Sequence, residues 1–235
     1  MLDLTLELPG GEFKAFAFKD SLRFHILLRE APDAALTDRL LQEIKRLRRR
    51  YPKRLTLLWY SQTEGFSTQL LDRLEYSNPN HFFLFRLAQD AIDTNVDMKG
   101  LTATECTPEL LDACAEILES AFTPYPDAPG TFRDDRERVE MECLNERGGA
   151  ILFYQGEDPV GLCARMEEHI TQVAVRKEYQ GKGFGEAMLR SLLLSIREMG
   201  RDAELCVGYD NARAIALYQK VGFKKVYESV QVKLR

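Results

Sequence analysis

A glycine-rich loop between a predicted strand and a predicted helix is the feature of this sequence with the clearest chemistry. It reads Gln180-Gly181-Lys182-Gly183-Phe184-Gly185 and follows the apolar run Val173-Ala174-Val175. The first amides of a helix have no partner within the helix, and the helix dipole favours negative charge there. Glycine also lets the backbone approach a phosphate closely. The segment therefore predicts an anion site, with Lys182 either adding charge or pointing to solvent.

The spacing of these glycines excludes two other phosphate-binding loops. A P-loop requires G-x-x-x-x-G-K-[ST], which the sequence does not contain. A dinucleotide fingerprint requires G-x-G-x-x-G after the first strand of a βαβ unit. Here the spacing is G-x-G-x-G and the loop comes late in the chain. An ordinary turn remains the alternative for the loop taken alone.

A second motif lies downstream, in residues 211–223. Its spacing is N-x-x-A-x-x-L-Y-x-x-x-G-F, carried by Asn211, Ala214, Leu217, Tyr218, Gly222 and Phe223. Together with the loop it resembles the GNAT superfamily of N-acetyltransferases, whose cofactor motif Q/R-x-x-G-x-G/A is matched by Gln180, Gly183 and Gly185. The resemblance covers about residues 100–235.

The resemblance implies a co-substrate, acetyl-CoA, and the residues that bind it. In the family, acetyl-CoA lies where two parallel strands splay apart, so the strand at 169–175 would pair with the pantetheine arm and the loop amides would hold the pyrophosphate. Asn211 would contact the arm, or else only cap the next helix. The expected binding residues are Val173, Ala174, Val175, Gln180, Gly181, Lys182, Gly183, Phe184, Gly185 and Asn211.

The chemistry implied by the resemblance is direct transfer of an acetyl group to a neutral amine. Tyr218 would give a proton to the departing CoA thiolate; the alternative is that its ring only packs against the sheet. Glu167, Glu168 and His169 cluster at the start of the cofactor strand. Glu168 is our choice of base, although each of the three could equally be a solvated hairpin residue, and some family members need no dedicated base.

The acceptor pocket is expected between predicted helices at 108–120 and 132–146. Residues 96–235 carry 18 Lys and Arg against 24 Asp and Glu, which favours a cationic acceptor. An acidic, solvated helix face is the alternative for these charges. The candidates for lining the pocket are Phe122, Tyr125, Phe132, Asp134, Asp135, Glu137 and Glu140.

The polar segment 89–100 predicts a boundary between two domains. Residues 1–95 would form a small α/β domain, and residues 96–235 a GNAT domain with a mixed, strongly twisted sheet and helices on both faces. Alternation and helical spacing predict strands at 2–8, 13–19, 22–29, 55–60, 81–87, 101–105, 149–155, 159–166, 169–175, 204–208 and 225–234, and further helices at 33–50, 67–74, 185–199 and 211–220.

The first domain repeats the element order of the second. Residues 70–76 resemble residues 217–223, and in both places a long helix and a strand precede. A partial GNAT-like repeat without the glycine loop is one interpretation, and chance similarity of short segments is the other.

Composition narrows the remaining classes of function. The five cysteines have irregular spacing and no C-x-x-C, so we expect neither a disulfide framework nor a bound metal. No apolar run could span a bilayer and the start of the chain alternates like a strand, so we expect a cytoplasmic protein without membrane contact. A basic patch within residues 45–54 could contact RNA, but it also suits the C-terminal end of a helix.

We therefore predict an N-acetyltransferase that uses acetyl-CoA to modify a primary amine of a small molecule or peptide. It would work as a monomer or homodimer, without nucleic acid. The alternative is a regulatory protein that binds acetyl-CoA without turnover. A third interpretation is an RNA- or protein-binding module built around the basic patch.

Overall fold

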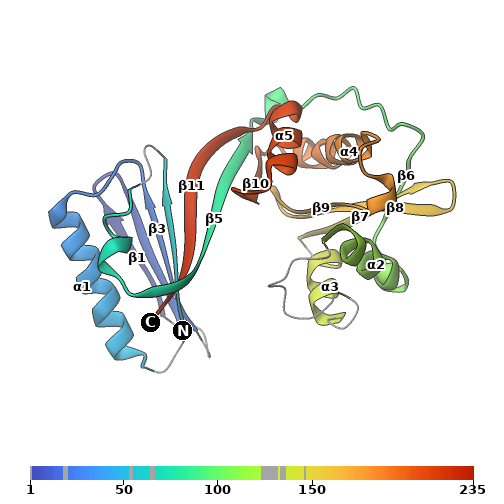
Figure 1. Cartoon of the computed structure of the whole chain (residues 1–235). Coiled ribbons are helices and arrows are strands. Elements are labelled where there is room, and N and C mark those ends of the chain that lie inside the picture. The colour runs from blue at the N-terminus through green and yellow to red at the C-terminus, as the bar shows by residue number, and fades with distance from the viewer. Residues whose placement is uncertain are drawn as a thin grey trace. The chain divides into compact units, whose positions relative to one another are not determined.

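The chain folds into two compact units, each built from more than one stretch of sequence. The computed structural model describes residues 2–17, 21–52, 55–63, 67–122, 132, 136–145 and 147–235 (Figure 1). Unit 1 comprises residues 1–84, 207–212 and 225–235, and unit 2 comprises residues 85–206 and 213–224. The domain boundary predicted at residue 95 stays a prediction, because these units are defined by contacts and not by independent folding.

Unit 1 contains six strands and one long helix. In order along the sheet, the strands are β1 (Leu2–Leu8), β2 (Gly11–Ala17), β3 (Ser21–Leu28), β4 (Leu55–Gln62), β11 (Lys224–Leu234) and β5 (Tyr76–Leu87). β1, β2 and β3 are antiparallel neighbours, β3 and β4 are parallel, and β4 and β11 are antiparallel. The helix α1 (Ala34–Arg50) connects β3 to β4, and a 3-10 turn η1 (Leu71–Arg73) precedes β5.

Helix α1 forms because its apolar residues recur on one face and its ends are capped. The Asp33 carboxylate accepts a hydrogen bond from the amide of Leu36, which satisfies one of the free N–H groups of the first turn. Basic residues at 48–50 occupy the last turn, where they complement the dipole. The inward face packs with Phe13, Phe24 and Tyr60 into the core of unit 1.

Unit 2 contains five strands, with helices on both faces of their sheet. In order along the sheet, its strands are β10 (Ala203–Gly208), β9 (His169–Val175), β8 (Asp158–Met166), β7 (Gly148–Gln155) and β6 (Thr102–Glu105). β9 and β10 are parallel, and the other neighbouring pairs are antiparallel. The helices are α2 (Leu111–Phe122), α3 (Arg136–Cys143), α4 (Phe184–Glu198) and α5 (Ala212–Val221), with 3-10 turns η2 (Gln89–Ala91), η3 (Pro108–Leu110) and η4 (Lys177–Tyr179).

The two faces of this sheet are covered by different pairs of helices. Figure 1 shows α2 and α3 on one side of β7–β9, and α4 and α5 on the other. Leu118 of α2 and Val139 of α3 are buried against Leu162 of β8. Helix α4 buries Met188, Leu192 and other apolar residues at its 3.6-residue period, which holds its N-terminal end fixed beside β9.

Two predicted helices differ from the structure. Residues 67–74 hold only the 3-10 turn η1, and α3 spans residues 136–143 of the predicted 132–146, of which 133–135 and 146 lie outside the described residues. The segment 67–74 is short, so helix propensity alone does not overcome the cost of nucleation there. No helix in the described ranges is long and apolar enough to cross a membrane.

The polar segment 89–100, predicted from the sequence to be a domain boundary, is part of unit 2 and is held in place by contacts with it. The amide of Gln89 donates to Asp202 Oδ1 at 2.9 Å, and Asp93 lies 3.8 Å from the guanidinium of Arg190 on α4. Ile92 is buried between these contacts along the chain. The polar composition of this segment therefore gave no sign of its contacts with the rest of unit 2.

Candidate active site

The glycine-rich loop forms the N-terminal end of α4, as predicted. Gly183 is the N-cap residue with φ +81°, and Gly181 has φ +79°. Both angles lie in the left-handed region that glycine adopts without strain. No side chain caps the helix among the described residues, so the first amides of α4 are left for another acceptor.

A lysine that sequence reasoning missed lies over this loop. A Cβ built on Gly183 would come within 3.1 Å of Lys99 Cε and 3.7 Å of Lys99 Nζ. Lys99 therefore places an ammonium group at the positive end of the helix. Lys182 points elsewhere, with its Nζ 4.8 Å from the centre of the Tyr179 ring. Lys99 lies far upstream of the loop, in the polar segment 89–100, so no local sequence spacing could place it beside Gly183.

The side chain of Gln180 fixes the loop between a strand and a helix. Its Nε2 donates to the Val175 carbonyl at 2.8 Å, and its Oε1 accepts from Arg213 in the first turn of α5. Gly185 packs beside the end of β9, since a Cβ added to it would make an ordinary van der Waals contact with Val175 Cγ2 at 3.4 Å. The loop is thus tied to the end of β9 and the start of α5.

Strand β9 pairs fully on one side and only at its start on the other. Val173, Ala174 and Val175 have register partners in β8. Towards β10, the ladder within the described residues consists of His169 and Ile170 alone. The buried hydroxyl of Thr171 also has no hydrogen-bond partner in the described part of the chain. The later half of β9 therefore has backbone groups available to a ligand in extended conformation.

Tyr218 of α5 is buried to 9% exposure between two aromatic rings. The ring centres of Phe85 and Phe223 lie 6.4 Å and 6.0 Å away. Burial, together with the nearby Cys163 thiol, raises the pKa of the phenol to about 12. The group therefore stays protonated through the neutral range, which is the state needed to donate a proton.

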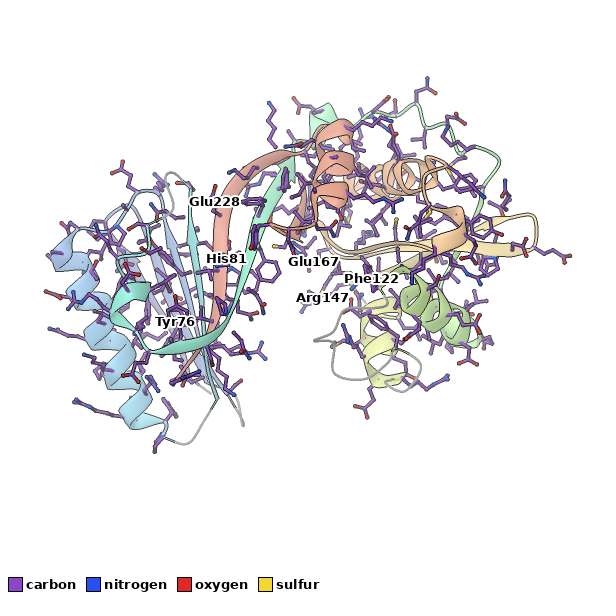
Figure 2. The ribbon with its side chains drawn as sticks, in the orientation of Figure 1. Tyr76, His81, Phe122, Arg147, Glu167 and Glu228 are labelled. Carbon is purple, nitrogen blue, oxygen red and sulfur yellow. The ribbon has the colours of Figure 1, made fainter. Side chains whose placement is uncertain are left out.

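Glu168 lies at the turn between β8 and β9 and is paired with a cation. Arg201 contacts Glu168 Oε2 at 2.5 Å and Glu167 Oε2 at 3.2 Å. This hydrogen bond from Arg201 lowers the pKa of the Glu168 carboxyl. Figure 2 shows Glu167 beside Arg147, whose carbonyl accepts from the Glu167 amide at 2.7 Å. Burial lowers the pKa of His169, so its imidazole is neutral in the neutral range.

The aromatic residues predicted for the acceptor pocket meet at the end of α2. The ring centres of Phe122 (labelled in Figure 2) and Phe132 are 6.2 Å apart, and Arg138 covers the Phe132 ring at 4.4 Å. Glu140 is paired with Arg136 at 3.2 Å, and Glu137 is exposed. Tyr125, Asp134 and Asp135 lie outside the described residues.

Asn211 directly precedes α5, and its amide donates to the Gly208 carbonyl at 3.0 Å. Among the described residues, no group of three or more His, Cys, Asp or Glu is arranged to hold a metal ion. Of the basic patch on α1, Arg46 pairs with Glu43 and Arg48 donates to the Arg235 carbonyl, while Lys53 and Arg54 lie outside the described residues.

Sequence comparison identifies the family. The Acetyltransferase (GNAT) family profile matches residues 111–223. The N-alpha-acetyltransferase RimI of Mycobacterium tuberculosis is 31% identical over 134 residues, covering 55% of this chain and 82% of that protein. A mycothiol acetyltransferase of Propionibacterium freudenreichii is 25% identical over 142 residues, covering 56% of this chain and 46% of that protein. The chain belongs to the GNAT acetyltransferase family and is an acyltransferase.

Solved structures agree with this fold. A GCN5-related N-acetyltransferase from Kribbella flavida aligns with a TM-score of 0.61 over 99% of this chain and 93% of its own, at 14% identity. A tandem GNAT protein from the clavulanic acid biosynthesis pathway aligns with a TM-score of 0.61 over 95% of this chain and 78% of its own, at 13% identity. The predicted GNAT fold is confirmed, whereas the partial repeat in unit 1 stays a hypothesis.

Proposed function

We propose that unit 2 binds acetyl-CoA at the start of α4 and transfers its acetyl group to a primary amine. The observation that carries this is the uncapped N-terminal end of α4, where the flexible side chain of Lys99 lies against Gly183. Free amides, helix dipole and one lysine together favour a pyrophosphate. GNAT acetyltransferases use acetyl-CoA as co-substrate, and its pyrophosphate suits this end of the helix.

The pantetheine arm would lie along the later half of β9. Its amides can hydrogen-bond to the backbone of Val173 and Val175, which lack β10 partners in the described ladder. The side chain of Ala174 is buried against the helices of the opposite face, which fixes the orientation of these backbone groups. Asn211 would contact the same arm from the start of α5, or cap that helix.

The acyl transfer would proceed by direct attack. The lone pair of a neutral amine attacks the thioester carbonyl carbon, forming a C–N bond, and the C–S bond then breaks. The sulfur leaves as a thiolate and takes the proton of the Tyr218 phenol. The amine proton passes to a base, for which Glu168 is our candidate, directly or through water.

The acceptor would be a primary amine of a small molecule or peptide. Both named relatives carry acetyltransferase names, one of them for an N-alpha position. The aromatic pair Phe122 and Phe132 would form an apolar wall of the acceptor pocket. The exposed carboxylate of Glu137 would favour the approach of a cation that loses a proton before attack.

Unit 1 is expected to lack a second cofactor site. β3 and β4 pair continuously from Ser21 with Leu55 to Leu28 with Gln62, so β3 offers no free edge there. The first turn of α1 is already capped by the Asp33 carboxylate, whose charge repels phosphate. The element order β3–α1–β4 matches β9–α4–β10. Its described residues, however, lack both features proposed to bind acetyl-CoA, which are a free strand edge and an uncapped helix.

Calorimetric titration with acetyl-CoA tests the proposal. We expect saturable binding with one site per chain, because within the described residues the open strand and the uncapped helix both belong to unit 2. Acetyl-CoA at 100 times its Kd should stabilise the fold by about 2.7 kcal/mol and raise the melting temperature accordingly. Absence of binding by the folded chain, or two equivalent sites, would contradict the proposal; binding would justify a screen of amines for turnover.

The role of Glu168 can be tested through its ion pair with Arg201. If Glu168 is the base, its lowered pKa sets the acidic limb of kcat/KM, and activity falls as pH drops through that value. Arg201→Met removes the cation, so the pKa should rise and the limb should move to higher pH. Glu168→Gln should remove the limb and slow turnover. An unchanged limb in Arg201→Met, with full activity in Glu168→Gln, would remove Glu168 from the mechanism.

A further inference from the structure

Three thiols from distant parts of unit 2 meet beneath its sheet edge. Cys106 directly follows β6, Cys114 lies in α2 and Cys143 ends α3. The sulfur atoms of Cys106 and Cys114 are 3.4 Å apart, and Cys143 belongs to the same packed cluster as both. We call these three residues the thiol cluster. The acetyl transfer proposed above uses none of them.

The members of the thiol cluster differ in their access to solvent. Cys114 and Cys143 are fully buried, whereas Cys106 is half-buried. Cys106 and Cys143 line a cavity of about 190 Å³ that also includes the side chain of Arg165. A small reagent that enters this cavity can therefore reach Cys106, while Cys114 does not line it.

Hydrogen bonding gives Cys106 the character of a nucleophile. The Cys114 thiol, 3.4 Å away, hydrogen-bonds with its sulfur and, together with the neighbouring Cys143, lowers the pKa of Cys106, against the opposing effect of burial. The pKa of Cys114 is raised by the same contact. A thiolate that is accessible and has a second thiol in contact is the arrangement found in oxidation-sensitive cysteines.

We propose that Cys106 is a peroxide-reactive residue that forms a reversible disulfide with Cys114. The Cys106 thiolate attacks one oxygen of a hydroperoxide; the O–O bond breaks, sulfur is oxidised to a sulfenic acid, and the second oxygen leaves reduced as water or an alcohol. The Cys114 sulfur then attacks the Cys106 sulfur and loses its proton. The S–O bond breaks and water leaves. A dithiol reductant restores both thiols.

The geometry selects Cys114 as the residue that resolves the sulfenic acid, and it determines which elements the disulfide would join. Its sulfur needs to approach from 3.4 Å to the roughly 2.05 Å of a disulfide. The Cys106 amide is fixed to the Ala150 carbonyl at 2.8 Å, so most of the movement falls on α2. Oxidation would thus attach the first half of α2 covalently to the end of β6.

Disulfide mapping of the full chain after treatment with hydrogen peroxide tests this inference without any assay of acetyl transfer. Cleavage after glutamate cuts at Glu105, Glu109 and Glu116, so Cys106 and Cys114 fall into different peptides. We expect a linked pair of these peptides that a dithiol separates. A link from Cys106 to Cys143, or no link, overturns the proposed pair.

One variant and one internal comparison separate the reactivity of Cys106 from a mere failure to fold. Cys114→Ala lacks the resolving thiol, so a sulfenic acid should persist on Cys106 and be trapped by dimedone. Cys206 is also half-buried but stands outside the cluster, and burial raises its pKa. Peroxide should consume Cys106 at least about tenfold faster than Cys206 in the wild type. Equal rates, or trapping on another cysteine, contradict the inference.

Discussion

Gly183→Glu should abolish acetyl-CoA binding while leaving the chain folded. The new carboxylate would stand at the N-terminal end of α4, where the pyrophosphate is proposed to lie, and would pair with Lys99, whose side chain is 3.1 Å from the position of the added Cβ. Two unit charges 4 Å apart near a protein surface repel by about 4 kcal/mol, so affinity should fall by two to three orders of magnitude, as roughly one order corresponds to 1.4 kcal/mol. Calorimetric titration with acetyl-CoA measures this loss.

The other end of the same helix supplies a matched control. Gly200 also has a left-handed backbone, with φ +72°, and an added Cβ there would meet nothing within 4 Å. Gly200→Glu therefore carries the same cost of about 1–2 kcal/mol for a side chain in this conformation. It should melt near Gly183→Glu and bind acetyl-CoA like the wild type. Unchanged affinity in Gly183→Glu would instead show that the loop does not hold the pyrophosphate.

Gly183→Ala divides this effect into bulk and charge. A methyl group comes close only to the flexible end of Lys99, which can move. We therefore expect a loss of affinity much smaller than that of Gly183→Glu. Equal losses in the two variants would mean that the backbone angle of Gly183 is the requirement, and that electrostatic repulsion contributes little.

The strands and long helices of this protein could be predicted because their burial repeats along the sequence. Helix α4 lies within two residues of its predicted range, since apolar spacing and the closing Gly200 both mark it. The glycine loop was found for the same reason: strand, loop and helix are consecutive. Signals of this kind are local in the sequence, and so is the motif in residues 211–223.

What the sequence could not predict depends on contacts between distant segments. Lys99 lies over Gly183, and Cys106 meets Cys143, only because the chain folds β6 and α3 onto the same unit. The pairing of Arg201 with Glu168 has the same origin. The irregular spacing of the cysteines did not predict that three of them meet, because distance along the sequence gives no measure of distance between sulfur atoms.

The register of two parallel strand pairs distinguishes the units more clearly than any residue does. β3 and β4 pair over their whole length, whereas β9 and β10 pair only at His169 and Ile170 within the described ladder. Alternation predicts that each segment is a strand but does not say where two strands part. A free edge for acetyl-CoA is therefore a property of register, which explains why similar element order in unit 1 does not imply a second site.

Tyr218→Phe should slow acetyl transfer by about 10²-fold while leaving acetyl-CoA affinity unchanged. The variant keeps the ring that packs between Phe85 and Phe223 and removes only the hydroxyl. Without that proton the CoA sulfur must leave as a bare thiolate, which raises the barrier of C–S cleavage. Steady-state kinetics with an amine found by screening would show a lower kcat at an unchanged Kd for acetyl-CoA.

The pH dependence of turnover gives a further test of Tyr218 as the proton donor. Burial raises the pKa of Tyr218 to about 12, so the protonated form is retained below that value and lost only as pH rises through it. The ratio of wild-type to Tyr218→Phe turnover should therefore be constant from neutral pH to about pH 10.

Tyr60 provides the control, since burial raises its pKa to about 12 as well and its hydroxyl donates to Gln62 in unit 1. Tyr60→Phe should lose stability, about 1 kcal/mol, and keep its turnover. Equal turnover in wild type and Tyr218→Phe would assign Tyr218 to packing and leave the thiolate to be protonated by water.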